Sequence, residues 1–381
     1  MNRIYLDNSI TTRLDPLVLE EMLPFLEKSW GSSTQIHSFG RETKNATEKA
    51  RGRVVQVLGV MPEEIIFTSG GTEANNLAIR GVAKTLGYKG RVITTQVEHP
   101  SVTETCRALQ EEGHEAVFVP MRKEGIVHPE DVKKALTSKT FLISIIFAEG
   151  ETGAIQPVEE IALIAKERGI LFHTDACQVV GKVRLPLERP GIDLLTISAH
   201  KFHGPMGVGV LFIRTGTRLK PILSGGDEEF GLRPGTVSPP LALGLARALE
   251  LAEEQREANT TRIKHLEEQL LSGIKGIFAA AQLNGPPDAR LPGHLSMRFP
   301  GLEAASLLLN LDLEGIAVGA GKPCVSGALE VSSVLLAMGL SREEALSSLD
   351  FSMSRFNTSE EIARTVAALA GVVSRIRTVY I

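Results

Sequence analysis

The sequence of 381 residues has few cysteines, few aromatic residues and no strong excess of either charge. Its three cysteines, Cys106, Cys177 and Cys324, lie too far apart to suggest a disulfide framework or a zinc site. No run of lysine or arginine stands out and the formal net charge is −4, which gives little support to nucleic-acid or membrane-surface binding. No stretch approaches the roughly 18 apolar residues of a membrane span. Residues 1–7 lack the pattern of a secretory signal. We therefore expect a cytoplasmic globular protein without a metal site.

Hydrophobic periodicity is what the sequence does contain. From about residue 41 to residue 213, apolar segments of strand length alternate with segments of helical spacing. This alternation predicts crossover units and an α/β fold whose large domain has a mainly parallel sheet covered by helices. The expected strands are residues 65–68, 91–94, 116–119, 141–148, 170–174, 194–198 and 208–213. The expected helices are residues 42–58, 75–86, 102–112, 128–136 and 158–168.

After about residue 241 the pattern changes, and we expect a smaller α+β domain. A long helical region at 250–271 precedes a strand at 294–299 and helices at 304–313 and 358–376. Thr358 and Glu361 have the spacing of a capping box at the start of the last helix. Two lobes agree with the length, because a single hydrophobic core stops growing beyond ~250–300 residues. We place the large domain at 15–257 and the small domain at 1–14 and 258–381.

Four polar clusters directly follow predicted strands, where parallel sheets bind their ligands. The first, residues 69–73, includes Gly70 and Gly71 and opens a helix. Glycines allow backbone amides to approach a ligand, and a helix start offers unpaired donors to a phosphate. A plain strand-to-helix turn is an equally good interpretation of this motif alone. In the second cluster, residues 98–101, His99 would face the strand ends, although an exposed or satisfied histidine without function is the commoner case.

The third and fourth clusters carry an acid and an amine. Asp175 ends a buried apolar strand, where a carboxylate is costly unless a cation meets it. A protonated pyridine nitrogen is one such cation, and a helix cap is the alternative role. Lys201 lies beside two histidines and a glycine turn, where desolvation would lower the pKa of its amine and allow Schiff-base formation. A surface lysine is the alternative, but four clusters at successive strand ends favour one ligand site.

These motifs resemble those of the fold-type I enzymes that depend on pyridoxal 5′-phosphate (PLP), and within them the class V aminotransferase branch that contains the cysteine desulfurases. The resemblance runs almost from end to end. It is carried by residues 5–8 (YLDN), 11–12, 67–79 (FTSGGTEANNLAI), 98–102, 151–153, 156–157, 173–178, 198–209 and 231–236.

The resemblance implies a role for each residue of a PLP site. Lys201 would hold the cofactor as a Schiff base and move protons, and His99 would stack on the ring. Asp175 would pair with the ring nitrogen, and Gln178 with the phenolic oxygen. The phosphate would be held by Gly71, Thr72, Ser198 and His200, and by Thr236 of the neighbouring subunit in an expected homodimer.

The resemblance also implies a sulfur-carrying nucleophile at Cys324, whose thiolate Lys322 would favour. Here Lys322 and Pro323 replace the small residues usual before this cysteine, and proline restricts a loop that must move. Cys106 and Cys177 are expected to be structural.

Three departures lie on the substrate side. Asp350 stands where the family has an arginine that binds the substrate carboxylate. Losing that charge-assisted bond costs about 1.5–3 kcal/mol, and a like charge at ~4 Å adds about 4 kcal/mol near a surface. Binding of an amino acid should weaken strongly unless a cation such as Arg355 compensates. Glu149 and Gly150 replace asparagines, one of which touches the cofactor, and residues 32–35 depart from the family's pattern.

Three functions follow as hypotheses. The leading one is a PLP-dependent cysteine desulfurase that converts L-cysteine to L-alanine and passes persulfide sulfur from Cys324 to an acceptor protein. The second is a PLP-dependent lyase or transferase acting on a different amine, because of Asp350. The third is a PLP-binding scaffold of low activity in sulfur transfer.

Overall fold

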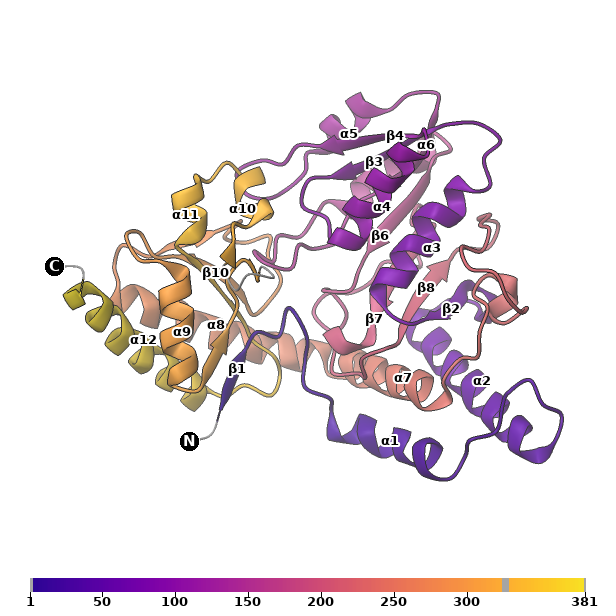
Figure 1. Cartoon of the computed structure of the whole chain (residues 1–381), viewed down its shortest axis with the longest axis horizontal. Helices are drawn as coiled ribbons and strands as arrows, with labels where there is room; N and C mark the ends of the chain where they lie inside the picture. The colour runs from indigo at the N-terminus through magenta and orange to yellow at the C-terminus, as the bar shows by residue number, and fades with distance from the viewer. Residues whose placement is uncertain (1–2, 324–328, 380–381) are drawn as a thin grey trace.

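A computed structural model describes residues 3–323 and 329–379, which form a large and a small lobe (Figure 1). Within these ranges a sheet of seven strands forms the centre of the large lobe. Six of these described strands run in one direction, and β8 runs antiparallel to both neighbours. The α/β class with a mainly parallel sheet is thus confirmed. In spatial order the strands are β2 (Ile65–Thr68), β8 (Gly209–Ile213), β7 (Leu194–Ser198), β6 (Leu171–Asp175), β5 (Thr140–Ser144), β3 (Arg91–Thr95) and β4 (Glu115–Val119).

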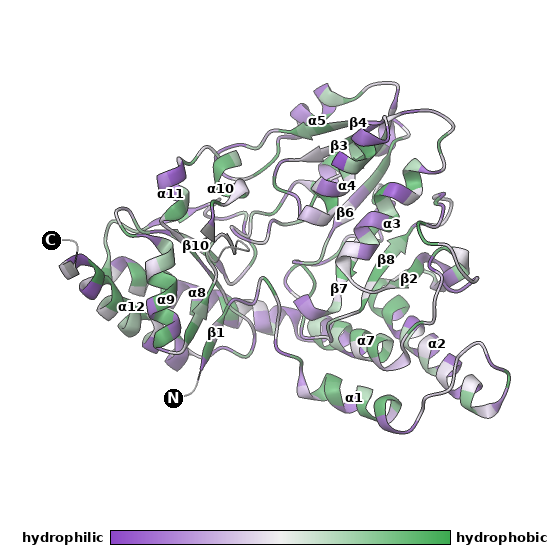
Figure 2. Ribbon diagram, in the orientation of Figure 1, coloured by the Kyte–Doolittle hydropathy of each residue, from purple (hydrophilic) through white to green (hydrophobic). Residues whose placement is uncertain are grey.

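Helices cover both faces of this sheet. Side chains from α3 (Gly71–Ala83) and α4 (Pro100–Glu111) form one apolar layer with the sheet. The opposite layer includes the buried rings of Phe67, Phe172 and Phe212. Because both faces are covered, strands such as β5 are buried along their whole length, and Figure 2 shows hydrophobic colour running through the sheet. The helices of the opposite layer and its surroundings are α1 (Pro16–Glu27), α2 (Ser38–Leu58), α5 (Pro129–Ala135), α6 (Val158–Glu167) and α7 (Pro239–Glu254).

The small lobe has an apolar cluster of its own, which also includes Ile4 and Leu6 from the start of the chain. Its sheet has the spatial order β14, β10, β9, and β1 pairs separately with β11. The Thr358–Glu361 capping box is confirmed by reciprocal bonds of 3.1 and 3.2 Å. The domain boundaries stay a prediction. The elements are β1 (Ile4–Leu6), α8 (Arg256–Ile277), β9 (Gln282–Asn284), β10 (His294–Arg298), α9 (Ala304–Leu313), β11 (Ile316–Val318), β12 (Lys322–Pro323), β13 (Leu329–Glu330), α10 (Ser333–Ala337), α11 (Arg342–Leu346), β14 (Ser348–Ser352) and α12 (Ser359–Val379).

Some predicted boundaries were wrong. The apolar run 141–148 continues past the end of β5 at Ser144, because its later residues stay buried without pairing as a strand. The helical region 250–271 is two helices that meet at Gln255. Among the helices of the described chain, none is long and apolar enough to cross a membrane.

Candidate active site

The four polar clusters predicted from the sequence lie at one edge of the large sheet. β2, β3, β6 and β7 run in the same direction, so their carboxyl ends meet at that edge. The cup (residues 69–73) follows β2, His99 follows β3, Asp175 ends β6, and Lys201 follows β7. Residues from four separate stretches of sequence are therefore gathered around one site.

The cup contains a glycine, Gly71, that has no room for a side chain. A Cβ at Gly71 would lie 2.9 Å from the Cys177 sulfur and 3.5 Å from the Ser198 Cβ. Gly70 before it has φ +150°, a conformation that favours glycine. The first turn of α3 leaves amide groups without partners inside the helix, and Thr72 at this turn is exposed. Such a helix start suits a phosphate group.

Asp175 is buried at the end of β6, with 5% of its surface exposed. One carboxylate oxygen accepts a hydrogen bond of 2.7 Å from the Asn75 amide, and the other accepts one of 3.0 Å from the Cys177 backbone. Among the described side chains, no lysine or arginine forms an ion pair with Asp175. A buried carboxylate with this geometry is suited to a cationic ligand.

Asn75 is a site residue that sequence reasoning missed. Its amide also donates to the Ser101 hydroxyl at 2.8 Å, and that hydroxyl lies 2.7 Å from the His99 ring nitrogen. Asn75 therefore links the acid to the histidine. Its only signal in the sequence was its place one turn after Gly71 on α3.

Lys201 points its amine toward the N-terminal segment. The amine donates to the Ser9 and Ile10 carbonyls at 2.6 and 2.8 Å. Burial lowers the pKa of Lys201, and the charges of Cys177, Asp175 and Asp7 oppose that shift. A lower pKa leaves more of the amine neutral and able to attack an aldehyde.

His200 is held in its neutral form beside this lysine. Its ring nitrogen contacts the Thr11 hydroxyl at 3.1 Å. Burial, the charge of Lys201 and that of His99 lower the pKa of His200 to about 4. A neutral imidazole can donate to a phosphate without adding charge near the amine.

The side chain of Gln178 packs close to Gly150. Its amide nitrogen donates to the Ser9 carbonyl at 2.8 Å, and a Cβ at Gly150 would lie 2.8 Å from that nitrogen. Within the described chain the Gln178 side-chain oxygen is buried and has no partner.

These residues fit PLP as a group. The cup offers amides to a phosphate, Asp175 offers a carboxylate to a ring nitrogen, and Lys201 offers an amine to an aldehyde. The Gln178 oxygen is a buried acceptor without a donor, which a phenolic hydroxyl would supply. Each feature of the cofactor has a matching group in the described part of the chain.

Asp350, which the sequence resemblance places on the substrate side, lies on β14. Its backbone pairs with Gly319 at 2.8 Å in both directions. One of its carboxylate oxygens is buried and has no partner among the described residues. Burial raises the pKa of Asp350 well above its ordinary value, and the charges of Glu151, Glu149 and Asp7 raise it further.

Two neighbouring residues show how this side is arranged. Arg355, the cation named from the sequence as able to compensate Asp350, instead donates to Asp15 at 2.5 Å. Glu149 accepts three bonds, from the Glu151 amide and from the Thr152 amide and hydroxyl, at 2.8, 2.7 and 2.9 Å. Glu149 therefore stabilises a turn, while one carboxylate oxygen of Asp350 has no partner among the described residues.

The remaining predicted residues differ in position. Thr236 is exposed on the segment that follows Gly235. Cys106 and Cys177 are buried, and burial raises the pKa of Cys106 to about 12 and that of Cys177 well above its ordinary value. Cys324 lies outside the described residues.

This arrangement, a mainly parallel sheet with a lysine, an acid and a helix start at one edge, defines a fold-type I enzyme site. The family model described as aminotransferase class-V matches residues 4–365, and the chain belongs to that family. The chain is 43% identical over 377 residues to the cysteine desulfurase IscS of Dictyoglomus turgidum, covering 99% of this chain and 96% of that protein.

Solved structures agree with the family assignment. A structure described as a NifS-like protein is similar at 38% identity and a TM-score of 0.92, covering 98% of this chain and all of the other. Another, described as SspA in complex with cysteine, is similar at 31% identity and a TM-score of 0.82 over 94% of this chain and 100% of the other.

Proposed function

We propose that this chain is a PLP-dependent cysteine desulfurase, which converts L-cysteine to L-alanine and carries the released sulfur on Cys324. The observation that carries the proposal is the meeting at one edge of the sheet of Lys201 after β7, Asp175 at the end of β6 and the start of α3. Similarity over 99% of the chain to a cysteine desulfurase supports the same substrate.

Each residue has a separate task in this reaction. PLP, when bound, withdraws electrons from the carbon atoms next to the substrate nitrogen. Asp175 keeps the ring nitrogen protonated, and Asn75 fixes the orientation of that carboxylate. Lys201 would hold the cofactor aldehyde and would move the proton at the substrate α-carbon. His99, whose imidazole is oriented by Ser101, would lie against the ring.

Cys324 is the proposed sulfur acceptor within the chain. The other two cysteines are buried thiols with raised pKa values, so neither is suited to form a thiolate. The persulfide on Cys324 would then pass to an acceptor protein. A cytoplasmic location remains a prediction from the cysteine pattern.

The test is a spectral titration of the purified, PLP-loaded protein with L-cysteine, followed by a sulfide assay under reductant. We expect cysteine to change the cofactor spectrum and to release sulfide, and Cys324→Ala to abolish release while the spectral change persists. If L-cysteine changed neither the cofactor spectrum nor the sulfide level, the proposal would be refuted. Cys106→Ala is the matched control and should keep both signals.

We also propose that the protein acts as a homodimer. α1 and the segment after it carry several exposed apolar side chains that a second copy would cover. Trp30 and Ile36 are 76% and 89% exposed. In such a dimer Thr236 would reach the phosphate site of the other subunit. Light scattering of the wild type and of Trp30→Glu with Ile36→Glu tests this, and a monomeric wild type would contradict it.

A second candidate function rests on Asp350. An acid with an unmatched oxygen at the substrate end favours a different amine, one whose own cationic group would meet Asp350. A spectral screen of amines distinguishes the two functions, because only the second predicts a basic substrate that outcompetes cysteine.

A further inference from the structure

Residues 228–236, which we call the strap, adopt a backbone that side chains rarely accept. Glu229, Phe230 and Gly231 follow one another with φ of 49°, 58° and 75°. Two of these three residues are not glycine. Phe230 carries a bulky aromatic side chain, which is 57% exposed. Such conformations persist where surrounding contacts enforce them, and they gather at ligand clamps.

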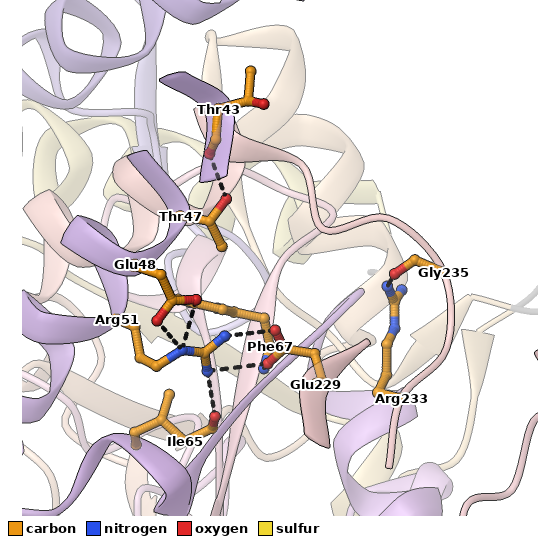
Figure 3. Close-up of polar contacts among 9 residues, drawn as sticks. All are labelled: Thr43, Thr47, Glu48, Arg51, Ile65, Phe67, Glu229, Arg233 and Gly235. Carbon is orange, nitrogen blue, oxygen red and sulfur yellow. Dashed lines mark hydrogen bonds and ion pairs between the residues drawn. The ribbon is translucent and has the colours of Figure 1, made fainter. Parts of the chain in front are cut away.

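A buried ion pair enforces the conformation at the first end of the strap (Figure 3). Arg51 of α2 and Glu229 are 3% and 7% exposed, and two bonds of 2.6 and 3.1 Å join them. Both partners also bind the backbone of β2. Arg51 donates to the Ile65 carbonyl at 2.5 Å, and Glu229 accepts from the Phe67 amide at 2.7 Å.

A second ion pair ties the strap to the cup itself. Arg233 donates to one oxygen of Glu73 at 2.8 Å. The other oxygen of Glu73 accepts a bond of 2.6 Å from the Ser69 amide. Because Ser69 and Glu73 are the two ends of the cup, the strap contacts both the strand that leads into the cup and the turn that forms it.

Replacing a buried ion pair by apolar residues is often neutral for stability, so the two pairs need a reason other than stability. They fix the direction of β2 and the shape of the turn between Ser69 and Glu73. The amides of that turn must converge on a phosphate within hydrogen-bond distance, and a small tilt of β2 would spread them.

We propose that Arg51, Glu229, Arg233 and Glu73 are positioning residues that hold the cup in the shape required by the phosphate of the cofactor. None of them needs to touch the cofactor. The inference rests on the proposed function, because it takes the ligand of the cup to be PLP.

The test compares two ligands that differ only in the phosphate. Cofactor-free protein is titrated with PLP and with pyridoxal, and the ratio of the two dissociation constants is measured together with the melting temperature. We expect Glu229→Gln, which keeps an acceptor for the Phe67 amide, to weaken PLP binding about tenfold, as is usual for groups behind a ligand contact. Pyridoxal binding should not change.

Glu250→Gln is the matched control. Glu250 forms a similar two-bond pair with Arg53, also on α2, at 2.6 Å each, but contacts neither β2 nor the strap. The ratio of the dissociation constants of PLP and pyridoxal in Glu250→Gln should equal that of the wild type. Should Glu229→Gln fail to fold, Arg233→Gln replaces it, because Arg233 is partly exposed and the same loss is expected.

Three outcomes contradict the inference or its basis. A wild-type ratio in both strap variants would overturn the positioning role. An equal loss of PLP and pyridoxal affinity, with a lower melting temperature, would show a merely structural role. A wild type that binds neither ligand would refute the proposed function, and this result is distinct because it appears without any substitution.

Discussion

The cofactor side and the substrate side of the site each hold an aspartate at low exposure, and the two have different surroundings. Both oxygens of Asp175 accept hydrogen bonds, from the Asn75 side chain and the Cys177 backbone. Asp350 has an oxygen without a described partner, and three other acids raise its pKa beyond the effect of burial. The first is hydrogen-bonded at both oxygens and suited to a cation, whereas burial and the neighbouring acids disfavour the charged form of the second.

This difference shows that cofactor binding and substrate recognition are separate properties of the fold. The sequence resemblance expects the cup, Asp175 and Lys201 to match the motifs of the family and Asp350 and Gly150 to depart from them. In the structure Gln178 packs close to Gly150. We therefore expect the protein to bind PLP tightly and to bind the substrate cysteine weakly.

The largest effect is expected for Lys201→Ala, which should abolish covalent PLP and lower turnover by about 10⁴-fold, the upper range for a proton-transfer group. The measurement is the visible absorbance of the loaded protein and the rate of sulfide release. Lys182→Ala is the control, because burial and the charge of Lys201 lower the pKa of Lys182 to about 7. If the absorbance band of covalent PLP survived in Lys201→Ala and disappeared in Lys182→Ala, the assignment of the Schiff base to Lys201 would be wrong.

Asp175→Asn should lower kcat by about 100-fold, the equivalent of one strong charge-assisted hydrogen bond. An amide cannot keep the ring nitrogen protonated, although it fits the same space. Steady-state kinetics and the cofactor spectrum check this result. Asp193→Asn is the control at the other end of the sheet, where Asp193 accepts from the Phe172 amide at 2.8 Å. Equal losses in both variants would mean that the effect is structural.

Asp350→Asn sharpens the comparison from the other side, since it should improve the enzyme. Removing an acid near the substrate carboxylate should lower KM for cysteine about tenfold, less than the ~4 kcal/mol of a full charge pair, because the raised pKa leaves Asp350 partly neutral. The kcat and the cofactor spectrum should stay unchanged. A higher KM would show that Asp350 contributes to binding and would favour the basic-amine substrate.

The sequence predicted the parts of this molecule in which a strand is buried on both faces. β2 and β7 begin and end at the predicted residues, because turn residues bound their apolar runs. α1 was missed because only Val18 and Met22 among its residues are buried against the large lobe, whereas Leu17, Leu19 and Leu23 are exposed, so its apolar residues do not form one clear helical stripe.

The site divides in the same way. Residues that act at the end of their own strand, such as Asp175 and Lys201, could be proposed from local sequence. Asn75 could not, because its role depends on contact with an acid far along the chain. The sequence also could not predict that Arg355 leaves Asp350 without an ion pair among the described residues. This outcome depends on the contact of Arg355 with Asp15, which lies far away in the sequence.

The smallest effect concerns pH, and it has opposite signs on the two sides. Burial lowers the pKa of His173, beneath the cofactor side, from 6.5 to about 4. A lowered pKa means that the unfolded chain binds more protons, so this stability is present above pH 6.5 and is lost as the pH falls toward 4. Between pH 7 and pH 5.5 the loss is about 1 kcal/mol.

Asp7 acts in the reverse direction. Burial raises its pKa from 3.8 to about 6, against the charge of Lys201, so its stabilising effect is present below pH 3.8 and is lost as the pH rises through 6. Denaturant unfolding at several pH values should therefore show a flatter acid limb in His173→Gln and a smaller loss between pH 4 and 6 in Asp7→Asn. His265→Gln, at an exposed position, should follow the wild type. If both variants changed the pH dependence of the free energy of unfolding in the same direction, the opposite effects expected for His173 and Asp7 would be contradicted.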